Sequence, residues 1–268
     1  MEKTFTISEI AKLLGLTSDA VRFYEKKGLV HPQTNPSNKY RIYGMHNILE
    51  LLDIIYYRHL DMSVADIQGI CKDSRKEVMR ELIRQKREES EKRIRYENHL
   101  LKKLSYVSDL FENVETNRNV FCIRMFQESI VLFESHSTSE FFTKQIQHFS
   151  TDQFVLCSLF KQYQIHPDEL KEEKTFITLE RQINQELQME IPQDATIYPQ
   201  QECVFCMISM PHNGIGYEEV AKLSAYAKSQ GYKTENCLYV REIPLTLYTD
   251  EDNYYAELYI PIKKDNER

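Results

Sequence analysis

The sequence predicts an α+β protein built from a small helical head, one long charged helix and a C-terminal region of strands. Short helical blocks separated by turns fill residues 5–72, and no glycine or proline occurs between Gly69 and Pro167. Within that interval, residues 74–113 are dense in Glu, Lys, Arg and Leu, which favour helices. From Val120 onward, runs rich in Tyr, Phe, Val and Ile alternate with polar residues, as strands do.

Charge is distributed unevenly along the 268 residues, whose formal net charge is −7. Residues 1–76 carry 11 basic and 9 acidic side chains, and residues 77–114 carry 9 and 8. Residues 115–268 carry 14 and 24, so the net negative charge lies entirely in the C-terminal part. Because local charge governs contact with phosphate, a near-neutral front and an acidic rear indicate two separate functions.

The composition also excludes classes of protein. Hydrophobic residues make up 41% of the chain, which allows a packed core. No stretch approaches the roughly 20 apolar residues that span a bilayer. The first residues lack the layout of a signal peptide, so we expect a cytoplasmic protein without a membrane partner. The six cysteines fit reduced thiols in that compartment better than a disulfide framework.

The head begins with a capping box, in which Thr6 and Glu9 bond to each other's backbone at the start of a helix. That helix stops at Gly15, and Thr17 can cap a second helix that runs through Lys27 and ends at Gly28. Two short helices joined by a glycine-containing turn define a helix-turn-helix, whose second helix lies in the DNA major groove.

The second helix presents an outward surface that includes Ser18 and Arg22, and Arg22 can pair with guanine edges or with phosphate. A basic, aromatic stretch over residues 38–43 follows two prolines and is expected to form a wing along the DNA backbone. A helix over residues 45–60 and another from Ser63 complete the predicted head.

Apolar residues recur at spacings of 4, 3, 4 and 3 near the end of the charged stretch, which is a heptad seam formed by Leu100, Leu104, Val107, Phe111 and Val114. One helix of about 40 residues is roughly 60 Å long and cannot bury a narrow stripe within one subunit. We therefore expect a coiled coil that forms a dimer. The alternative is a helix that packs on its own domain.

Strands are expected over six segments, at residues 121–133, 154–164, 175–182, 202–210, 236–244 and 254–262. Helices are expected at residues 139–149 and 217–230. The order strand–helix–strand thus occurs twice and indicates a duplicated module.

The last strand places Tyr255, Glu257 and Tyr259 on one face. An acid between two aromatic rings is the composition of a cation cage, since ring faces attract positive charge and the carboxylate neutralises it. The alternative is a solvent-exposed Glu257 beside half-buried, packing tyrosines.

Metal and catalytic sites are not expected. Cys203 and Cys206 are three residues apart in a strand and would point to opposite faces, so the pair cannot chelate. Cys71 is a lone thiol. No phosphate loop, nucleophile elbow or paired-carboxylate signature is present. We expect no enzyme activity, no catalytic residue and no cofactor, with a DNA-binding head fused to a small-molecule hydrolase as an alternative.

A family resemblance rests on a set of residues spread over residues 5–72: Thr6-Ile7-Ser8-Glu9-Ile10-Ala11-Lys12, Gly15-Leu16, Val21-Arg22-Phe23-Tyr24-Glu25, Gly28-Leu29-Val30, Pro32 and Tyr40-Arg41-Ile42-Tyr43. In order and spacing this set resembles the head of MerR-type winged-helix transcription regulators. The sequence departs from the family where Ala20-Val21 replaces Thr-Ile, which is a conservative change. It also departs where Lys39 and Asp61 replace glycines, a difference that concerns the geometry of the turns and not the fold.

The resemblance implies a homodimer joined by an antiparallel coiled coil over residues 74–114, after a DNA-binding domain at residues 1–73. Such regulators bind an overlong promoter spacer and, on effector binding, bend and untwist it so that RNA polymerase can use the promoter. The residues implied to contact DNA are Arg22, Tyr24, Lys39, Tyr40 and Arg41, and we expect Ser18 on the outward surface of the second helix to join them.

Residues 115–268 resemble, by their length and layout, the gyrase-inhibitor-like effector-binding domain of multidrug sensors of the BmrR/TipA type, with an antiparallel sheet. The resemblance implies a small, cationic lipophilic effector that contacts Glu257, and the alternation of the strand adds Tyr255 and Tyr259 to the expected effector site. The expected function is therefore an effector-responsive regulator, an activator of transcription. A constitutive DNA-binding regulator is the alternative.

Overall fold

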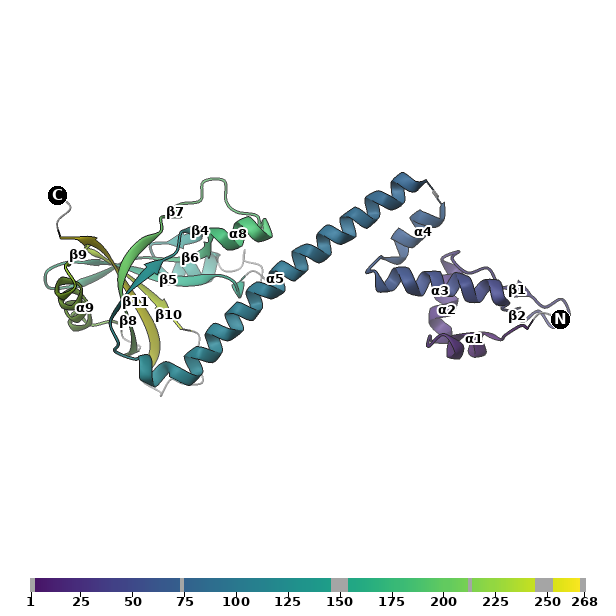
Figure 1. Ribbon diagram of the computed structural model, residues 1–268, viewed down its shortest axis with the longest axis horizontal. Helices are drawn as coiled ribbons and strands as arrows, with labels where there is room; N and C mark the ends of the chain where they lie inside the picture. Colours follow the sequence, from purple (N-terminus) through teal and green to yellow (C-terminus); the bar gives the residue numbers. More distant parts are fainter. Residues whose placement is uncertain (1–2, 73–74, 146–153, 212–213, 244–252, 266–268) are drawn as a thin grey trace. The chain divides into compact units, whose positions relative to one another are not determined.

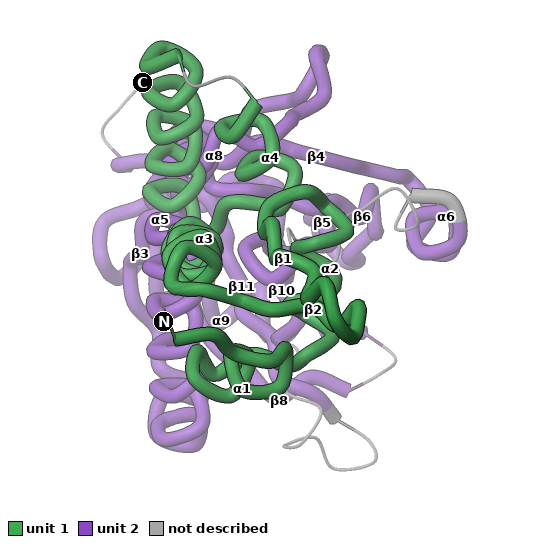
Figure 2. The backbone as a smooth tube through the Cα atoms, turned by 90° about the vertical axis from the view of Figure 1, so that its right-hand side faces the viewer, with its two compact units in different colours: residues 1–93 green, residues 94–268 purple. Residues whose placement is uncertain are grey.

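The computed structural model describes residues 3–72, 75–145, 154–211, 214–243 and 253–265. The chain divides into two compact units, residues 1–93 and residues 94–268, and each is described by itself (Figure 2). None of the helices within the described ranges is long and apolar enough to cross a membrane.

The first unit contains five helices or parts of helices and a two-stranded hairpin, in the order α1 (Ile7–Leu13), α2 (Ser18–Lys26), β1 (Gln33–Thr34), β2 (Arg41–Ile42), α3 (Met45–His59), α4 (Val64–Lys72) and the start of α5 (Lys76–Asn117). The predicted capping box is confirmed: the Glu9 amide donates to Thr6 Oγ1 at 3.3 Å, and the Thr6 amide donates to Glu9 Oε2 at 2.8 Å. Gly15 and Gly28 follow α1 and α2 with φ of +66° and +68°, a conformation that glycine adopts without strain.

The core of the head joins α1, α2 and α3 through fully buried side chains such as Ile10, Val21 and Leu51. The helix expected over residues 45–60 is confirmed as α3, on which Tyr56 is 62% exposed. In the hairpin, β1 pairs antiparallel with β2, and the loop between them bends at Lys39, whose φ is +61°. Asp61, after α3, has a φ of +65°. Lys39 and Asp61 therefore both adopt the left-handed conformation, which glycine adopts without strain.

The helix α5 is as long as predicted, but the residues of its heptad seam differ in exposure and in what they pack against. Leu104 is 64% exposed, whereas Val107 and Phe111 pack against the sheet of their own unit, and Val114 is buried there. The coiled-coil interpretation is therefore wrong for the C-terminal turns of the seam, because the sheet of the same chain covers them.

The second unit is organised around a nine-stranded antiparallel sheet (Figure 1). Its strands are β3 (Cys122–Phe126), β4 (Ser129–Ser135), β5 (Ser158–Ile165), β6 (Leu170–Glu180), β7 (Ile197–Tyr198), β8 (Gln201–Pro211), β9 (Tyr232–Thr234), β10 (Cys237–Glu242) and β11 (Asn253–Lys264). They lie in the order β3-β8-β11-β10-β5-β6-β4-β7, and β9 pairs with β11.

The sheet repeats one topology in its two halves. The strands β4, β5 and β6 lie in the order β4-β6-β5, and β8, β10 and β11 lie in the matching order β8-β11-β10. The two halves meet where β5 pairs antiparallel with β10. This arrangement agrees with the predicted duplication of a strand–helix–strand module.

Several predicted elements differ in detail from the structure. The segment expected as one strand over residues 121–133 is a pair, β3 and β4. The helix expected over residues 139–149 is α6 (Thr138–Glu140) followed by the π-helix η1 (Phe141–Gln145), and residues 146–149 lie outside the described residues. The sequence missed the short elements α8 (Arg181–Leu187), β7 and β9.

The two faces of the sheet carry separate cores. The C-terminal turns of α5 pack on one face with Phe205, Tyr255 and Tyr259. The helix α9 (Tyr217–Ser229) covers the other face (Figure 1). Cys203 belongs to the first core and Cys206 to the second, so the prediction that they point to opposite faces is confirmed.

Candidate functional sites

The first candidate site is the exposed surface of α2. Thr17 caps this helix by accepting from the Ala20 amide at 3.1 Å, which places Ser18 and Arg22 in its first two turns. The side chain of Arg22 is 59% exposed and its Nη1 donates to Asp19 Oδ1 at 2.8 Å. An exposed pair of this kind stabilises the helix by little, so the guanidinium is available to another acceptor.

The hairpin supplies a second group of exposed side chains. Tyr40 is 75% exposed at the end of the loop that Lys39 turns. The side chain of Arg41 is 58% exposed, and its Nε donates to Glu25 Oε1 on α2 at 2.5 Å. That pair joins the hairpin to the helix of the first site. Tyr24, in contrast, is half-buried and packs against the core of the head.

The third candidate site lies on the sheet face that α5 covers. Tyr255, Glu257 and Tyr259 share that face as the alternation predicts, and the Tyr259 hydroxyl donates to Glu257 Oε2 at 2.7 Å. Glu257 is only 2% exposed, which contradicts the alternative of a solvent-exposed carboxylate. The Tyr255 hydroxyl donates instead to Glu115 Oε1 on α5 at 2.6 Å.

Glu257 has a cationic partner that the sequence analysis missed. Arg241 on β10 stands directly opposite Glu257 in the register with β11, and its Nη2 lies 2.7 Å from Glu257 Oε2. Tyr106 of α5 completes the group: its hydroxyl donates to Glu257 Oε1 at 3.0 Å and accepts from Arg241. The Arg241 guanidinium also lies 5.0 Å from the centre of the Tyr106 ring. A further cation, Arg124, lies 3.8 Å from Glu257 Oε1.

Burial governs the protonation of this cluster. It raises the pKa of the Tyr106 and Tyr259 phenols, so both stay protonated and donate hydrogen bonds. Burial opposes the charge of Arg241, but the Glu257 carboxylate outweighs it and the pKa of the guanidinium is raised. Burial and then the charge of Arg241 lower the pKa of Lys103, which lies on α5 one turn before Tyr106.

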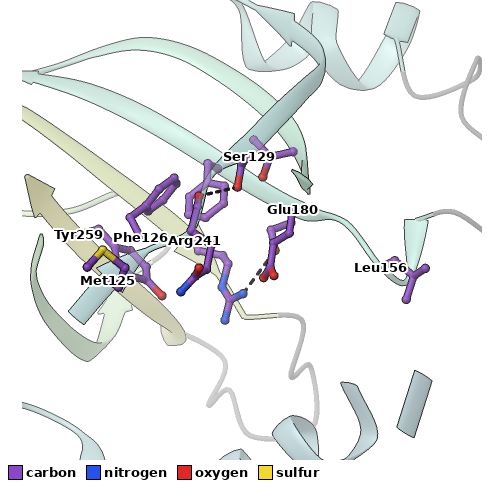
Figure 3. A pocket seen from close by; sticks show the side chains of 11 residues that line it. Met125, Phe126, Ser129, Leu156, Glu180, Arg241 and Tyr259 are labelled. Atoms are coloured by element: carbon purple, nitrogen blue, oxygen red, sulfur yellow. Dashed lines mark hydrogen bonds between the residues drawn. The ribbon is translucent and has the colours of Figure 1, made fainter. Parts of the chain in front are cut away.

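A cavity of about 80 Å³ opens beside Arg241 (Figure 3). Its wall combines the guanidinium with four hydroxyl groups, one carboxylate and aromatic rings, supplied among others by Ser129, Ser158, Thr178, Glu180, Phe126, Phe160 and Tyr259. Arg241 Nη1 donates to Ser158 Oγ at 3.3 Å, so the arginine links the cavity to Glu257. Its volume is well below the roughly 300–1,000 Å³ of pockets that hold drug-sized ligands.

The described residues contain no group of three or more His, Cys, Asp or Glu side chains that could hold a metal ion. Burial raises the pKa of the Cys203 and Cys206 thiols to about 12, which makes both unreactive. The six cysteines are all free thiols.

The geometry of the head defines a helix-turn-helix module. Comparison with known proteins shows which helix-turn-helix family it is similar to. Residues 5–74 match the family model "MerR HTH family regulatory protein". The HTH-type transcriptional regulator CueR of Escherichia coli O157:H7 is 53% identical over 45 residues, which are 17% of this chain and 33% of CueR. The ZntR homolog of Haemophilus influenzae is 34% identical over 64 residues, or 24% of this chain and 47% of the homolog.

These matches cover between a third and a half of the relatives' lengths and lie in the head, which is similar to the helix-turn-helix of MerR-type regulators. Among solved structures, the cryo-EM structure of the EcmrR–DNA complex is aligned with 97% of this chain and 100% of its own, at 17% identity and a TM-score of 0.39.

Proposed function

We propose that the chain is a DNA-binding transcription regulator of the MerR type that acts as a homodimer and responds to a small molecule. In this proposal α2 enters the major groove, and Lys39, Tyr40 and Arg41 form a wing on the DNA backbone. The observation that carries DNA binding is the match of residues 5–74 to the MerR model, together with exposed basic side chains on α2 and the hairpin.

The proposed action at the promoter is activation. The regulator binds an overlong spacer and, when its effector binds, bends and untwists that spacer so that RNA polymerase can engage both promoter elements. Transcription in vitro from promoters with spacers of different length tests this step. Activation confined to the overlong spacer, and dependent on the protein, is the expected result; equal activation at all spacer lengths would contradict it.

Dimer formation is proposed through α5. Ile94, Leu101 and Leu104 follow one another at intervals of seven and three residues, and they are 61%, 60% and 64% exposed. Apolar residues at this spacing form the contact stripe of coiled coils. This part of α5 therefore takes over the role that the sequence analysis gave to the longer seam.

The proposed effector is an organic cation with aromatic surface, bound at Tyr255, Glu257 and Tyr259. Support comes from one feature of the cluster: Glu257 already holds a cation, the guanidinium of Arg241, next to a tyrosine ring. Ring faces and a buried carboxylate are the groups that attract positive charge.

The test compares one cation with its uncharged isostere by calorimetry on the full chain. Phenyltrimethylammonium and tert-butylbenzene have the same shape and differ in charge. Wild type should bind the cation more tightly, and Glu257→Gln, which keeps the size and removes the charge, should lose that preference. If Glu257→Gln weakens the binding of both compounds equally, or of neither, the proposed cation site is wrong.

A further inference from the structure

Arg241 makes the contacts that a cationic effector would need. It pairs with the Glu257 carboxylate at 2.7 Å, lies against the Tyr106 ring at 5.0 Å and donates to a hydroxyl of the cavity at 3.3 Å. Its side chain is 19% exposed, and Glu257 is 2% exposed. The Glu257 carboxylate accepts hydrogen bonds from Tyr106 and Tyr259 and forms an ion pair with Arg241. Its oxygens therefore have little acceptor capacity left for another cation.

We infer that Arg241 is an internal competitor for the effector at Glu257 and determines which cations can bind. This inference rests on the proposed effector site. An entering cation takes the place of the guanidinium at the carboxylate, and Arg241 turns away from Glu257. Only a ligand that also buries apolar or aromatic surface can offset the separation of the buried pair. Small, strongly hydrated cations are therefore rejected.

The size of the cavity supports displacement over simple filling. A volume of about 80 Å³ holds a few water molecules but no drug-sized ligand, so a ligand must move a side chain to enter. Arg241 and Tyr259 both line the cavity and both bind Glu257, and Arg241 is the charged one of the two. Its removal from the pair both enlarges the cavity and frees the carboxylate.

Glu180 supplies a second position for the released guanidinium. It lines the same cavity as Arg241 and is exposed. Its charge acts on Lys103, but its side chain forms no ion pair or hydrogen bond among the residues that the structure describes. The other charged groups that face the cluster are Lys103 and Arg124, both cations, which cannot receive Arg241. A move from Glu257 to Glu180 keeps Arg241 near a carboxylate in both states.

Displacement also changes what α5 contacts. Tyr106 donates to Glu257 and accepts from Arg241, so it loses its donor when Arg241 leaves. Occupancy of the site is thereby coupled to the contact between α5 and the sheet. Arg241 is in this sense a specificity-determining residue whose position reports whether the effector is bound.

The experiment measures binding of phenyltrimethylammonium and tert-butylbenzene to the full chain by calorimetry. Arg241→Met removes the competing charge and keeps an unbranched side chain, and it should tighten binding of the cation at least tenfold. Binding of tert-butylbenzene should change less than threefold. Lys161→Met is the matched control. Lys161 lies on the neighbouring strand β5 and pairs with Glu242 of β10 at 2.5 Å. Loss of the Lys161 charge should change cation binding less than twofold.

Two further variants separate competition from simple enlargement of the cavity and from misfolding. The double variant Arg241→Met, Glu257→Gln has no unpaired buried charge and should show no gain for the cation. Glu180→Gln should weaken cation binding severalfold in wild type, where Arg241 needs its second partner, and should have no effect in the Arg241→Met background. An equal effect in both backgrounds would mean that Glu180 attracts the ligand directly.

The outcomes distinguish this inference from the proposed function. If wild type binds the cation with a preference that needs Glu257, but Arg241→Met does not tighten it, the competitor role is wrong and the effector site stands. If neither wild type nor Arg241→Met binds the cation, both fail. If the double variant also binds the cation more tightly than wild type, the competitor role is wrong, because the loss of charge competition at Glu257 then does not cause the tighter binding.

Discussion

The head and the sheet unit handle their charged side chains in opposite ways. In the head, Arg22 and Arg41 are 59% and 58% exposed; Arg22 pairs with the exposed Asp19, and Arg41 pairs with Glu25, whose side chain is 20% exposed. In the sheet unit, Glu257 is 2% exposed and is held by an arginine and two tyrosines from three different elements. Exposed pairs can exchange partners with phosphate at little cost. A buried pair must stay satisfied, so it can act only through replacement of one partner by another.

The largest effect that this comparison predicts is on stability. Glu257→Leu leaves the Arg241 guanidinium buried without its carboxylate, so we expect a loss of about 3–5 kcal/mol in the free energy of unfolding. Asp19→Ala removes the acid of an exposed pair and should cost less than about 0.5 kcal/mol. Urea denaturation of the full chain, followed by circular dichroism, measures both. Similar losses for the two variants would remove the distinction between the units.

The next effect concerns DNA. Arg22→Ala should weaken binding by about 1–3 kcal/mol if the guanidinium reads a base, with relaxed sequence preference. If it holds a phosphate, the salt dependence of binding should fall by about one unit of slope instead. Titration of a labelled promoter at several salt concentrations decides between them.

Arg41→Ala in the hairpin serves as the parallel variant, and it also releases Glu25. Stability should change little for Arg22→Ala, since its partner Asp19 is 89% exposed. It should fall more for Arg41→Ala, because Glu25 is only 20% exposed and loses its cation. Unchanged DNA affinity in both variants would show that a different surface of the head faces the DNA.

These two regions also differ in how far the sequence predicts them. The capping box and the turn at Gly15 depend on residues within a few positions of each other, so their pattern is readable directly. The alternation in β11 likewise places Glu257 between two tyrosines on one face. Arg241 could not be found in this way, because its contact with Glu257 depends on which strand pairs with β11 and in what register.

The heptad seam illustrates the same limit. Its spacing correctly predicts that one side of α5 is apolar, but spacing alone does not predict whether a second chain or the same chain covers that side. Phe111 and Val107 pack on the sheet, and Leu104 does not. One stripe of the helix therefore serves two different contacts.

Two substitutions on α5 test that division. Leu104→Asp should weaken the dimer at least tenfold, because it places a carboxylate in the proposed contact stripe. The fold of the sheet unit should be unaffected, since Leu104 is 64% exposed. Phe111→Asp should instead destabilise the sheet unit, against which Phe111 packs. Sedimentation at several protein concentrations measures the first effect and thermal unfolding the second. A dimer insensitive to Leu104→Asp would exclude this part of α5 as the interface.

The smallest predicted effect is at the hairpin turn, where stability and DNA binding should respond in opposite directions. Lys39 has a φ of +61°, in the left-handed region that costs a residue with a Cβ about 1 kcal/mol relative to glycine. Lys39→Gly should therefore stabilise the head by up to about 1 kcal/mol, less the entropy that glycine adds to the unfolded chain. The same change removes a positive charge from the proposed wing and should weaken DNA binding with a lower salt slope.

Lys39→Asn is the matched control, because asparagine tolerates the left-handed conformation but carries no charge. It should weaken DNA binding as Lys39→Gly does, with a smaller gain in stability. Hydrogen exchange of the hairpin amides reports the stability, and titration of promoter DNA reports the binding. If Lys39→Gly leaves DNA affinity and its salt dependence unchanged, Lys39 makes no contact with the backbone. Its retention at a strained position would then need another cause, because a left-handed lysine without a ligand only costs stability.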